Sequence, residues 1–407
     1  MESNKNFINI PNFTTQDSFT SLLDLARWIA AFIVFIGHLR SPIFCIYTEV
    51  EQKTLLVKIF YFVTDLGVEA VMIFFVLSGF LVGGKNLARA TSGSFNFYNY
   101  CIDRISRLYV VLLPALVICF FLDVIGSTYF IEAGLYNHEH DIIRNNFPEH
   151  VIAEHLNSGL LIANFFMLQS FYTETVGSNF PLWSLSFEFW FYLVFGLLLL
   201  AGSKQGQLIG KFGCIVLALV IIILLGYKFV LYFLIWGIGL SVVFFNRSII
   251  KSPIVALIFF VASLIISRLK LIDITYLHHL LVALTFGIFL LSMKGVNNSF
   301  LCKTKKINST LAGFSYSLYL LHFPLILFLL SVWVTVFQIS NFTSGYQPSS
   351  TAIVIYLVTM VVTLILSYGF ARVTEHNTAV VRQFLKRNLR LMAEKLQQVR
   401  ANWQTGN

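Results

Sequence analysis

The sequence predicts an all-α protein that crosses a membrane many times, and three observations indicate it. Of its 407 residues, 57% are hydrophobic and only 12% are charged, about half the charged share of a typical soluble protein. Apolar runs long enough to cross a bilayer recur along the chain, and basic residues gather in alternate connections between them. We therefore expect a polytopic bundle of about ten transmembrane helices, with a long outer loop after the third span.

Each apolar run fits one crossing of the hydrocarbon layer. We expect a cytosolic N-terminal tail over residues 1–21, a transmembrane domain over 22–372, and a cytosolic tail over 373–407. The expected spans are 22–40, 57–83, 105–125, 181–202, 212–227, 230–246, 252–268, 276–293, 311–336 and 351–372.

The basic residues indicate the orientation. With both termini in the cytosol, seven of the 28 Lys and Arg residues fall in outer loops, Arg27 falls in a span, and the other 20 lie inside. This is the positive-inside distribution, so the net charge of +9 needs no nucleic-acid partner. The five cysteines have no paired spacing, and we expect no bound metal. We expect an integral plasma-membrane protein in contact with lipid.

Two segments outside the spans have distinctive composition. The outer connection 126–180 begins polar, and its His138 and His140 suggest a solvated loop more than a metal site. Its later part, from Gly159 to Phe171, is apolar but too short to span, so it is either re-entrant or interfacial. The tail from Ala379 to Arg400 has the pattern of a basic amphipathic helix on the inner leaflet, or of a solvated helix.

The first span carries ionisable residues, which are costly within a membrane and therefore indicate function. Arg27 and His38 are eleven residues apart, which corresponds to about 16 Å along a helix. This spacing places the cation, Arg27, near one membrane face and the proton acceptor, His38, well across the membrane. The alternative is that Arg27 snorkels to the headgroups and His38 caps the helix near its exit.

Two later spans place carboxyl groups in their outer halves. Glu69 lies in the outer half of the second span, and Glu188 lies five residues deeper than Trp183 in the fourth. Their depth is comparable with that of His38, so we expect these three groups to converge around one polar cavity. Ser78, followed by a glycine in the second span, is typical of close helix packing.

Further candidates lie in the third and ninth spans. Arg104 and Arg107 are one helical turn apart at the inner start of the third span, and guanidinium groups bind phosphate bidentately. They could equally be positive-inside anchors. His322 is at mid-depth, just before Pro324, and is either a hydrogen-bonded structural residue or part of a substrate path.

Taken together, these stretches resemble the acyltransferase-3 family of membrane acyltransferases, which in bacteria decorate polysaccharides and similar acceptors. The matching stretches follow the family's order: Leu23 to His38, Gly67 to Phe80, Arg104 to Tyr109, Trp183 to Tyr192, and Ser315 to Pro324. The chain departs from the family pattern at Leu25, Trp28, Asp103 and Val110, and Glu375-His376-Asn377 resembles a terminal motif without its proline.

The resemblance implies transfer of an acyl group, acetyl from acetyl-CoA, to a hydroxyl of a surface polysaccharide or its lipid-linked precursor, in a bacterial inner membrane. It implies that His38 is the general base and that Glu188 or Glu69 orients it. Arg104, Arg107 and Arg27 would bind the donor, while His322, Ser78 and Trp183 would lie along the substrate path. The alternatives are a proton-coupled transporter of a small solute or glycan, and a non-catalytic polysaccharide-binding partner.

Overall fold

A computed structural model describes residues 17–137, 151–203, 208–245, 248–271, 274–339, 342 and 345–405. Within these ranges the chain forms helices joined by turns, with no β-sheet. Eight of the described helices are long and apolar enough to cross a membrane, which confirms the all-α polytopic architecture. His138 and His140 lie outside the described residues, as does the N-terminal tail up to residue 16.

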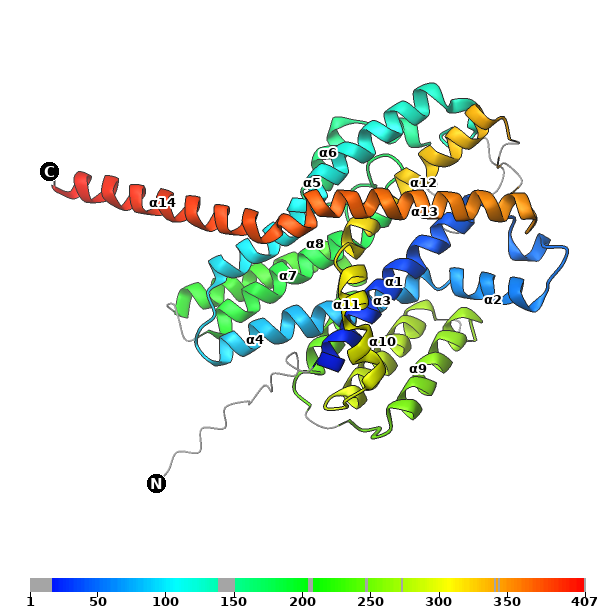
Figure 1. The fold of residues 1–407 in the computed structure, drawn as a ribbon. Coiled ribbons are helices and arrows are strands. Elements are labelled where there is room, and N and C mark those ends of the chain that lie inside the picture. The colour runs from blue at the N-terminus through cyan, green and yellow to red at the C-terminus, as the bar shows by residue number, and fades with distance from the viewer. Residues whose placement is uncertain are drawn as a thin grey trace.

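The long helices run alongside one another and define two ends of the bundle (Figure 1). Helix α1 (Asp17–Ile43) begins at what we call the proximal face, where Lys305 binds Asp17 at 2.5 Å. It ends at the distal face, where Arg40 shares the carboxylate of Asp65 with Arg268. Under the predicted orientation the proximal face is cytosolic.

The predicted second span, 57–83, is wrong in its outer part because the helix breaks before the crossing. Helix α2 (Leu55–Thr64) ends at Asp65, whose carboxylate pairs with Arg40 and Arg268. The crossing then runs through α3 (Gly67–Ser78), the π-helical turn η3 (Gly79–Gly83) and α4 (Gly84–Thr91). This ion network holds the break between α2 and α3 at the distal face. The apolar pattern of the sequence does not reveal such a break.

Helix α8 (Leu208–Ser241) contains two helical segments that correspond to the predicted spans 212–227 and 230–246, although the second segment ends earlier, at Ser241. Gly226 is non-helical, with φ 78° and ψ −174°, a conformation that glycine adopts readily. The preceding helix, α7 (Trp183–Gly202), ends just before α8 begins, yet Leu224 accepts from Tyr172 (2.8 Å), beside the start of α7. Trp236 then packs on Phe195, farther along α7 (4.9 Å). The chain therefore reverses direction at Gly226.

The other helices follow the expected order, with two differences. Helix α9 has 16 residues, and its length of about 24 Å is short for a full crossing. The ninth predicted span is preceded by α11, which packs along the first half of α1. The remaining bounds are α5 (Phe97–Tyr129), α6 (Ser158–Phe165), α9 (Pro253–Arg268), α10 (Thr275–Met293), α11 (Ser299–Ala312), α12 (Ser315–Phe337), α13 (Ser350–Val373) and α14 (Thr378–Thr405).

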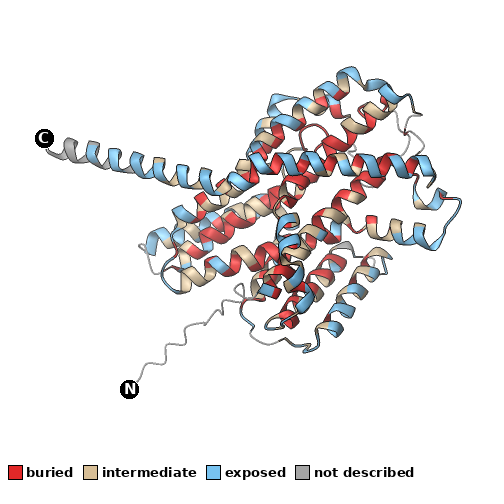
Figure 2. Ribbon diagram, in the orientation of Figure 1, coloured by how far each residue is buried: buried red, intermediate tan, exposed pale blue. Residues whose placement is uncertain are grey.

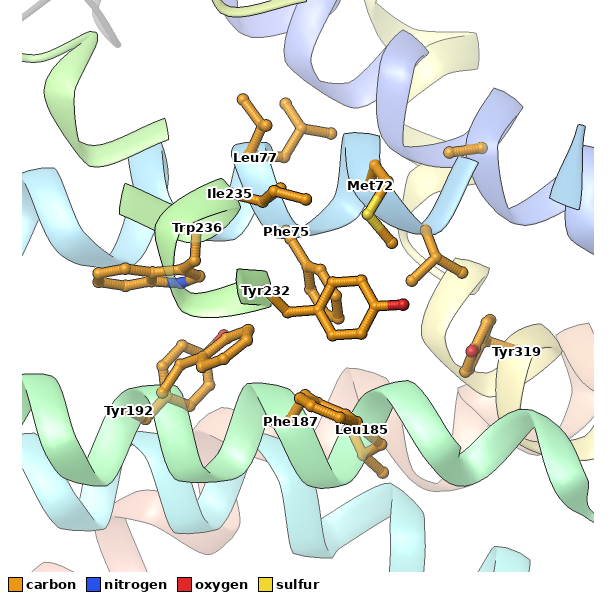
Figure 3. Packing of buried hydrophobic residues seen from close by; sticks show 14 of the residues in the cluster. Met72, Phe75, Leu77, Leu185, Phe187, Tyr192, Tyr232, Ile235, Trp236 and Tyr319 are labelled. Carbon is orange, nitrogen blue, oxygen red and sulfur yellow. The ribbon is translucent and has the colours of Figure 1, made fainter. Parts of the chain in front are cut away.

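Buried side chains concentrate in α1, α3, α7 and α12, while the outward sides of α9, α13 and α14 are exposed (Figure 2). Figure 3 shows Phe75 of α3 beside Tyr232 of α8, with Phe187 of α7 opposite. The close approach of this crossing to α8 depends on Gly79, where an added Cβ would lie 1.9 Å from the Trp236 carbonyl oxygen. The hydroxyl of Ser78 contacts the Tyr192 hydroxyl at 2.9 Å. The packing interpretation of this small pair is therefore confirmed.

The connection that precedes α7 folds back into the bundle. Helix α6 has eight residues and does not span. Polar side chains that follow it are almost fully buried, among them Gln169, Ser178 and Asn179. Ser178 donates to Asp123 of α5 through both its backbone N–H and its hydroxyl, each at 2.8 Å. This segment therefore contributes residues to the centre of the molecule.

Candidate functional site

A cavity of about 130 Å³ lies between α1, α3, α5, α7 and α12. Its walls combine guanidinium, carboxylate and phenol groups with apolar side chains. The lining residues are Arg27, Phe74, Phe75, Arg107, Leu108, Ser184, Leu185, Glu188, Tyr192, Ser315, Tyr316 and Tyr319. Of the nine site residues predicted from sequence, this cavity brings together Arg27, Arg107 and Glu188.

Arg27 reaches the cavity from α1 and has free hydrogen-bonding capacity. Its hydrogen-bond partner among the described residues is Asp24, one turn earlier on the same helix, with Nη1 at 3.4 Å from Oδ1. The side chain is 29% exposed. A guanidinium offers five N–H donors, so most of those of Arg27 remain available to a ligand.

Arg107 is held in place from the end of the transmembrane region. Its Nη2 donates to Oε1 of Glu375 at 2.9 Å, and Oε2 of Glu375 accepts from the backbone N–H (3.1 Å) and hydroxyl (3.0 Å) of Ser317. The guanidinium also lies over the Tyr316 ring, 5.6 Å from its centre. Glu375 thus connects α5, α12 and the turn after α13, which gives the acidic residue of the terminal motif a physical role.

Arg104 lies outside this cavity. It packs over the ring of Tyr192 at 5.5 Å, and its Nε is buried with no hydrogen-bond partner in the described part of the chain. The preceding Asp103 pairs with Lys386 of α14 at 2.8 Å. The departure at Asp103 therefore holds α14, which otherwise extends away from the bundle (Figure 1), against the start of α5.

The expectation that His38, Glu69 and Glu188 converge is wrong. Glu188 accepts from the Tyr192 hydroxyl on its own helix and lines the cavity. Glu69 accepts from Ser267 of α9 at 2.6 Å. Similar depth does not bring groups together, because each residue along a helix points in a different direction and these three face different neighbours.

The partner of His38 is His322. Nδ1 of His38 lies 2.7 Å from Nε2 of His322, and their rings are nearly parallel, at 7°. Both residues are buried, with 8% and 0% of their surface exposed. Phe180 packs against His38, with ring centres 4.9 Å apart. His322 therefore occupies the position in which a carboxylate was expected.

The environment of His322 follows from Pro324. Because proline has no N–H, the carbonyl of Leu320 four residues earlier loses its helical partner. Asn179 Nδ2 donates to this carbonyl at 2.9 Å, which anchors the segment before α7 to α12. The same segment continues into Phe180, whose ring covers His38. The backbone defect in α12 thus helps to bury the histidine pair.

Tyr319 stands between the cavity and the histidine pair. It lines the cavity, and its ring centre is 6.0 Å from that of His322, three residues later on α12. Its hydroxyl donates to the carbonyl of Pro181 at 2.7 Å and contacts the Ser184 hydroxyl at 2.6 Å. Tyr319 therefore separates the arginine-lined cavity from His322, and His38 lies on the other side of His322.

The residues expected along a substrate path have other surroundings. Ser78 is buried between Tyr192 and Trp236, which donates to its hydroxyl at 3.2 Å. Trp183 packs on Tyr232 at 5.8 Å and is half-buried. Neither Ser78 nor Trp183 lines the cavity. The sequence analysis assigned no site role to the tyrosines of the cavity wall or to Glu375.

Comparison with protein families gave one match: a family model described as an acyltransferase domain, over residues 21–372. Comparisons with curated proteins and with solved structures gave no match. Within the described residues, no cluster of three or more His, Cys, Asp or Glu side chains could hold a metal ion.

Proposed function

The chain belongs to the acyltransferase-3 family and is a membrane acyltransferase; from this premise we propose that it moves an acetyl group from acetyl-CoA to a carbohydrate hydroxyl. The acceptor would be a surface polysaccharide or its lipid-linked precursor, as in the polysaccharide-modifying members that the sequence resembles. One observation carries the proposal: only Tyr319 separates a cavity with two arginines from the buried pair of His322 and His38.

The donor would reach the cavity from the proximal face, which is cytosolic in the predicted orientation. At about 130 Å³ the cavity is smaller than the roughly 300–1,000 Å³ of most small-molecule sites, so it suits the thioester end of the donor rather than its nucleotide. Arg27 and Arg107 would bind oxygen atoms near that end. Arg104, one helical turn closer to the proximal face than Arg107, would meet the phosphates.

The acceptor would come from the distal side to His38. Nδ1 of His38 contacts His322, and Nε2 of His38 has no hydrogen-bond partner among the described residues. In the proposed reaction the acceptor hydroxyl gives its proton to Nε2 while its oxygen attacks the thioester carbonyl carbon. The carbon–sulfur bond then breaks, and the coenzyme A sulfur takes the proton from His38. Acetyl and proton are both conserved.

The test is acetyl transfer by the purified protein in lipid nanodiscs. Radiolabelled acetyl-CoA is supplied together with the surface-glycan fraction of cells that lack the protein. The proposal expects label in the glycan fraction and release of coenzyme A thiol. Absence of both, from protein that is folded and monodisperse, would contradict it. Mass spectrometry of surface glycans from cells with and without the protein then identifies the acetylated sugar.

A further inference from the structure

His322 has a geometry that determines which nitrogen of His38 is free. We propose that His322 is a positioning residue, which holds His38 as the tautomer protonated on Nδ1 and so presents an unprotonated Nε2 to the acceptor. This inference rests on the proposed role of His38 as general base. It assigns His322 a function other than contact with substrate.

The proton positions follow from the partners of His322. Its Nδ1 lies 3.0 Å from the carbonyl oxygen of Leu318 and 2.8 Å from that of Tyr319. Carbonyl oxygens only accept hydrogen bonds, so this nitrogen carries the proton. In a neutral imidazole the other nitrogen, Nε2, is then an acceptor. Nε2 faces Nδ1 of His38 at 2.7 Å, so the proton between the rings belongs to His38.

The arrangement of the rings supports a hydrogen bond rather than face-to-face stacking. The planes differ by 7°, but the ring centres are 5.0 Å apart, too far for stacked faces. A nitrogen–nitrogen distance of 2.7 Å at that separation requires the rings to meet edge to edge. The pair is enclosed by Phe180 and Phe323, whose ring centres lie 4.9 Å and 5.7 Å from that of His38. Little water can compete for the bond.

The same bond acts after proton transfer. When Nε2 of His38 takes the acceptor proton, the ring becomes a cation whose Nδ1–H points at a lone pair of His322. The hydrogen bond is then charge-assisted and stronger than before. The carbonyls of Leu318 and Tyr319 accept at the far side of His322, which orients its ring for this role. His322 thus takes the place that a carboxylate occupies in base–orienter pairs.

Two substitutions separate positioning from packing. His322→Gln places an amide oxygen near the position of Nε2, so it can still accept from His38. His322→Leu fills the space without an acceptor. His279→Leu is the matched control, because His279 is a buried histidine on α10 outside the site, 6% exposed.

With acetyl-CoA and the glycan fraction as substrates, kcat of His322→Leu should fall by about 10²-fold or more, with KM for acetyl-CoA little changed. The Gln variant should lie within about tenfold of wild type, and the control should be unaffected.

Solid-state ¹⁵N NMR of histidine-labelled protein at neutral pH reads the tautomer directly. His38, assigned by comparison with His38→Ala, should be protonated on Nδ1 and unprotonated on Nε2. In His322→Leu it should shift toward protonation on Nε2. A wild-type His38 protonated on Nε2 overturns the proposal, as does a Leu variant that keeps wild-type kcat or that loses no more activity than the Gln variant loses.

The spectra do not depend on turnover. If the wild-type protein transfers no acetyl group, the proposed function fails while the tautomer assignment still decides the role of His322. If His322→Leu does not fold, the wild-type spectrum and the kcat of the Gln variant provide the test.

Discussion

Removing the guanidinium of Arg107 should weaken donor binding by the free energy of the charge-assisted hydrogen bond that it makes to the donor. Charge-assisted hydrogen bonds contribute about 1.5–3 kcal/mol each. If one such bond to the donor is lost, the Kd for coenzyme A should rise by about 10- to 150-fold. The histidine pair does not contact Arg107, so it should persist in Arg107→Ala.

The same substitution should also destabilise the fold, and this effect must be separated from the loss of donor binding. Glu375 would keep the backbone N–H and hydroxyl of Ser317 but lose Arg107, while its side chain is only 3% exposed. A buried acceptor that loses a partner costs about 1–3 kcal/mol of stability. Thermal unfolding in nanodiscs measures that loss, and Arg107→Lys should restore charge but not the two-point geometry, so it rescues binding only in part.

Titration calorimetry with coenzyme A is the binding assay. Arg89→Ala is the matched control, because Arg89 is a proximal-face arginine that is 41% exposed and lies 3.9 Å from Asp103 rather than on the cavity. Its Kd should change by less than about threefold. If folded Arg107→Ala binds coenzyme A as tightly as wild type does, the assignment of the cavity to the donor is refuted.

Three other perturbations follow from the structure. Gly79→Val should lower the unfolding temperature, because a Cβ there would lie 1.9 Å from the Trp236 carbonyl oxygen and overpacking costs about 1–3 kcal/mol or more; unchanged melting would contradict the close approach. Asn179→Leu should cost about 1–3 kcal/mol and loosen the Phe180 cover, since the Leu320 carbonyl would lose its donor; limited proteolysis and thermal unfolding read this out. An impermeant thiol reagent should label Gln52→Cys but not Lys306→Cys in intact cells, and the reverse pattern would invert the faces.

The sequence predicted the helical architecture well because apolar length and charge placement report directly on the membrane. It separated the two passes of α8, which meet at Gly226 in a conformation favoured by glycine. The break at Asp65 was missed because it depends on Arg40 and Arg268, which are distant in sequence. Ion pairs of that kind leave no local periodic signal.

Three of the predicted site residues, Arg27, Arg107 and Glu188, line the cavity, but the contacts of the site residues were not predicted. Depth along a helix can be read from the sequence, but the facing direction cannot, so His38 was expected near a carboxylate instead of His322. The sequence did contain a clue to His322: it is a mid-depth histidine directly before Phe323 and Pro324, and Pro324 removes a helical hydrogen bond from α12. Glu375 offered a similar clue, because it is a carboxyl just past the last span, on the same side of the membrane as the first part of α5, which carries Arg107.

Acetyl transfer by His38→Ala is the most direct test of His38 as the general base. We predict a loss of at least the ~10²–10⁴-fold that a general base supplies, with coenzyme A binding within about twofold of wild type, and no rescue by His38→Gln, because an amide takes no proton. His279→Ala, the same change at another buried histidine, should retain transfer. Wild-type rates of transfer by a well-folded His38→Ala protein would show that His38 is not the general base.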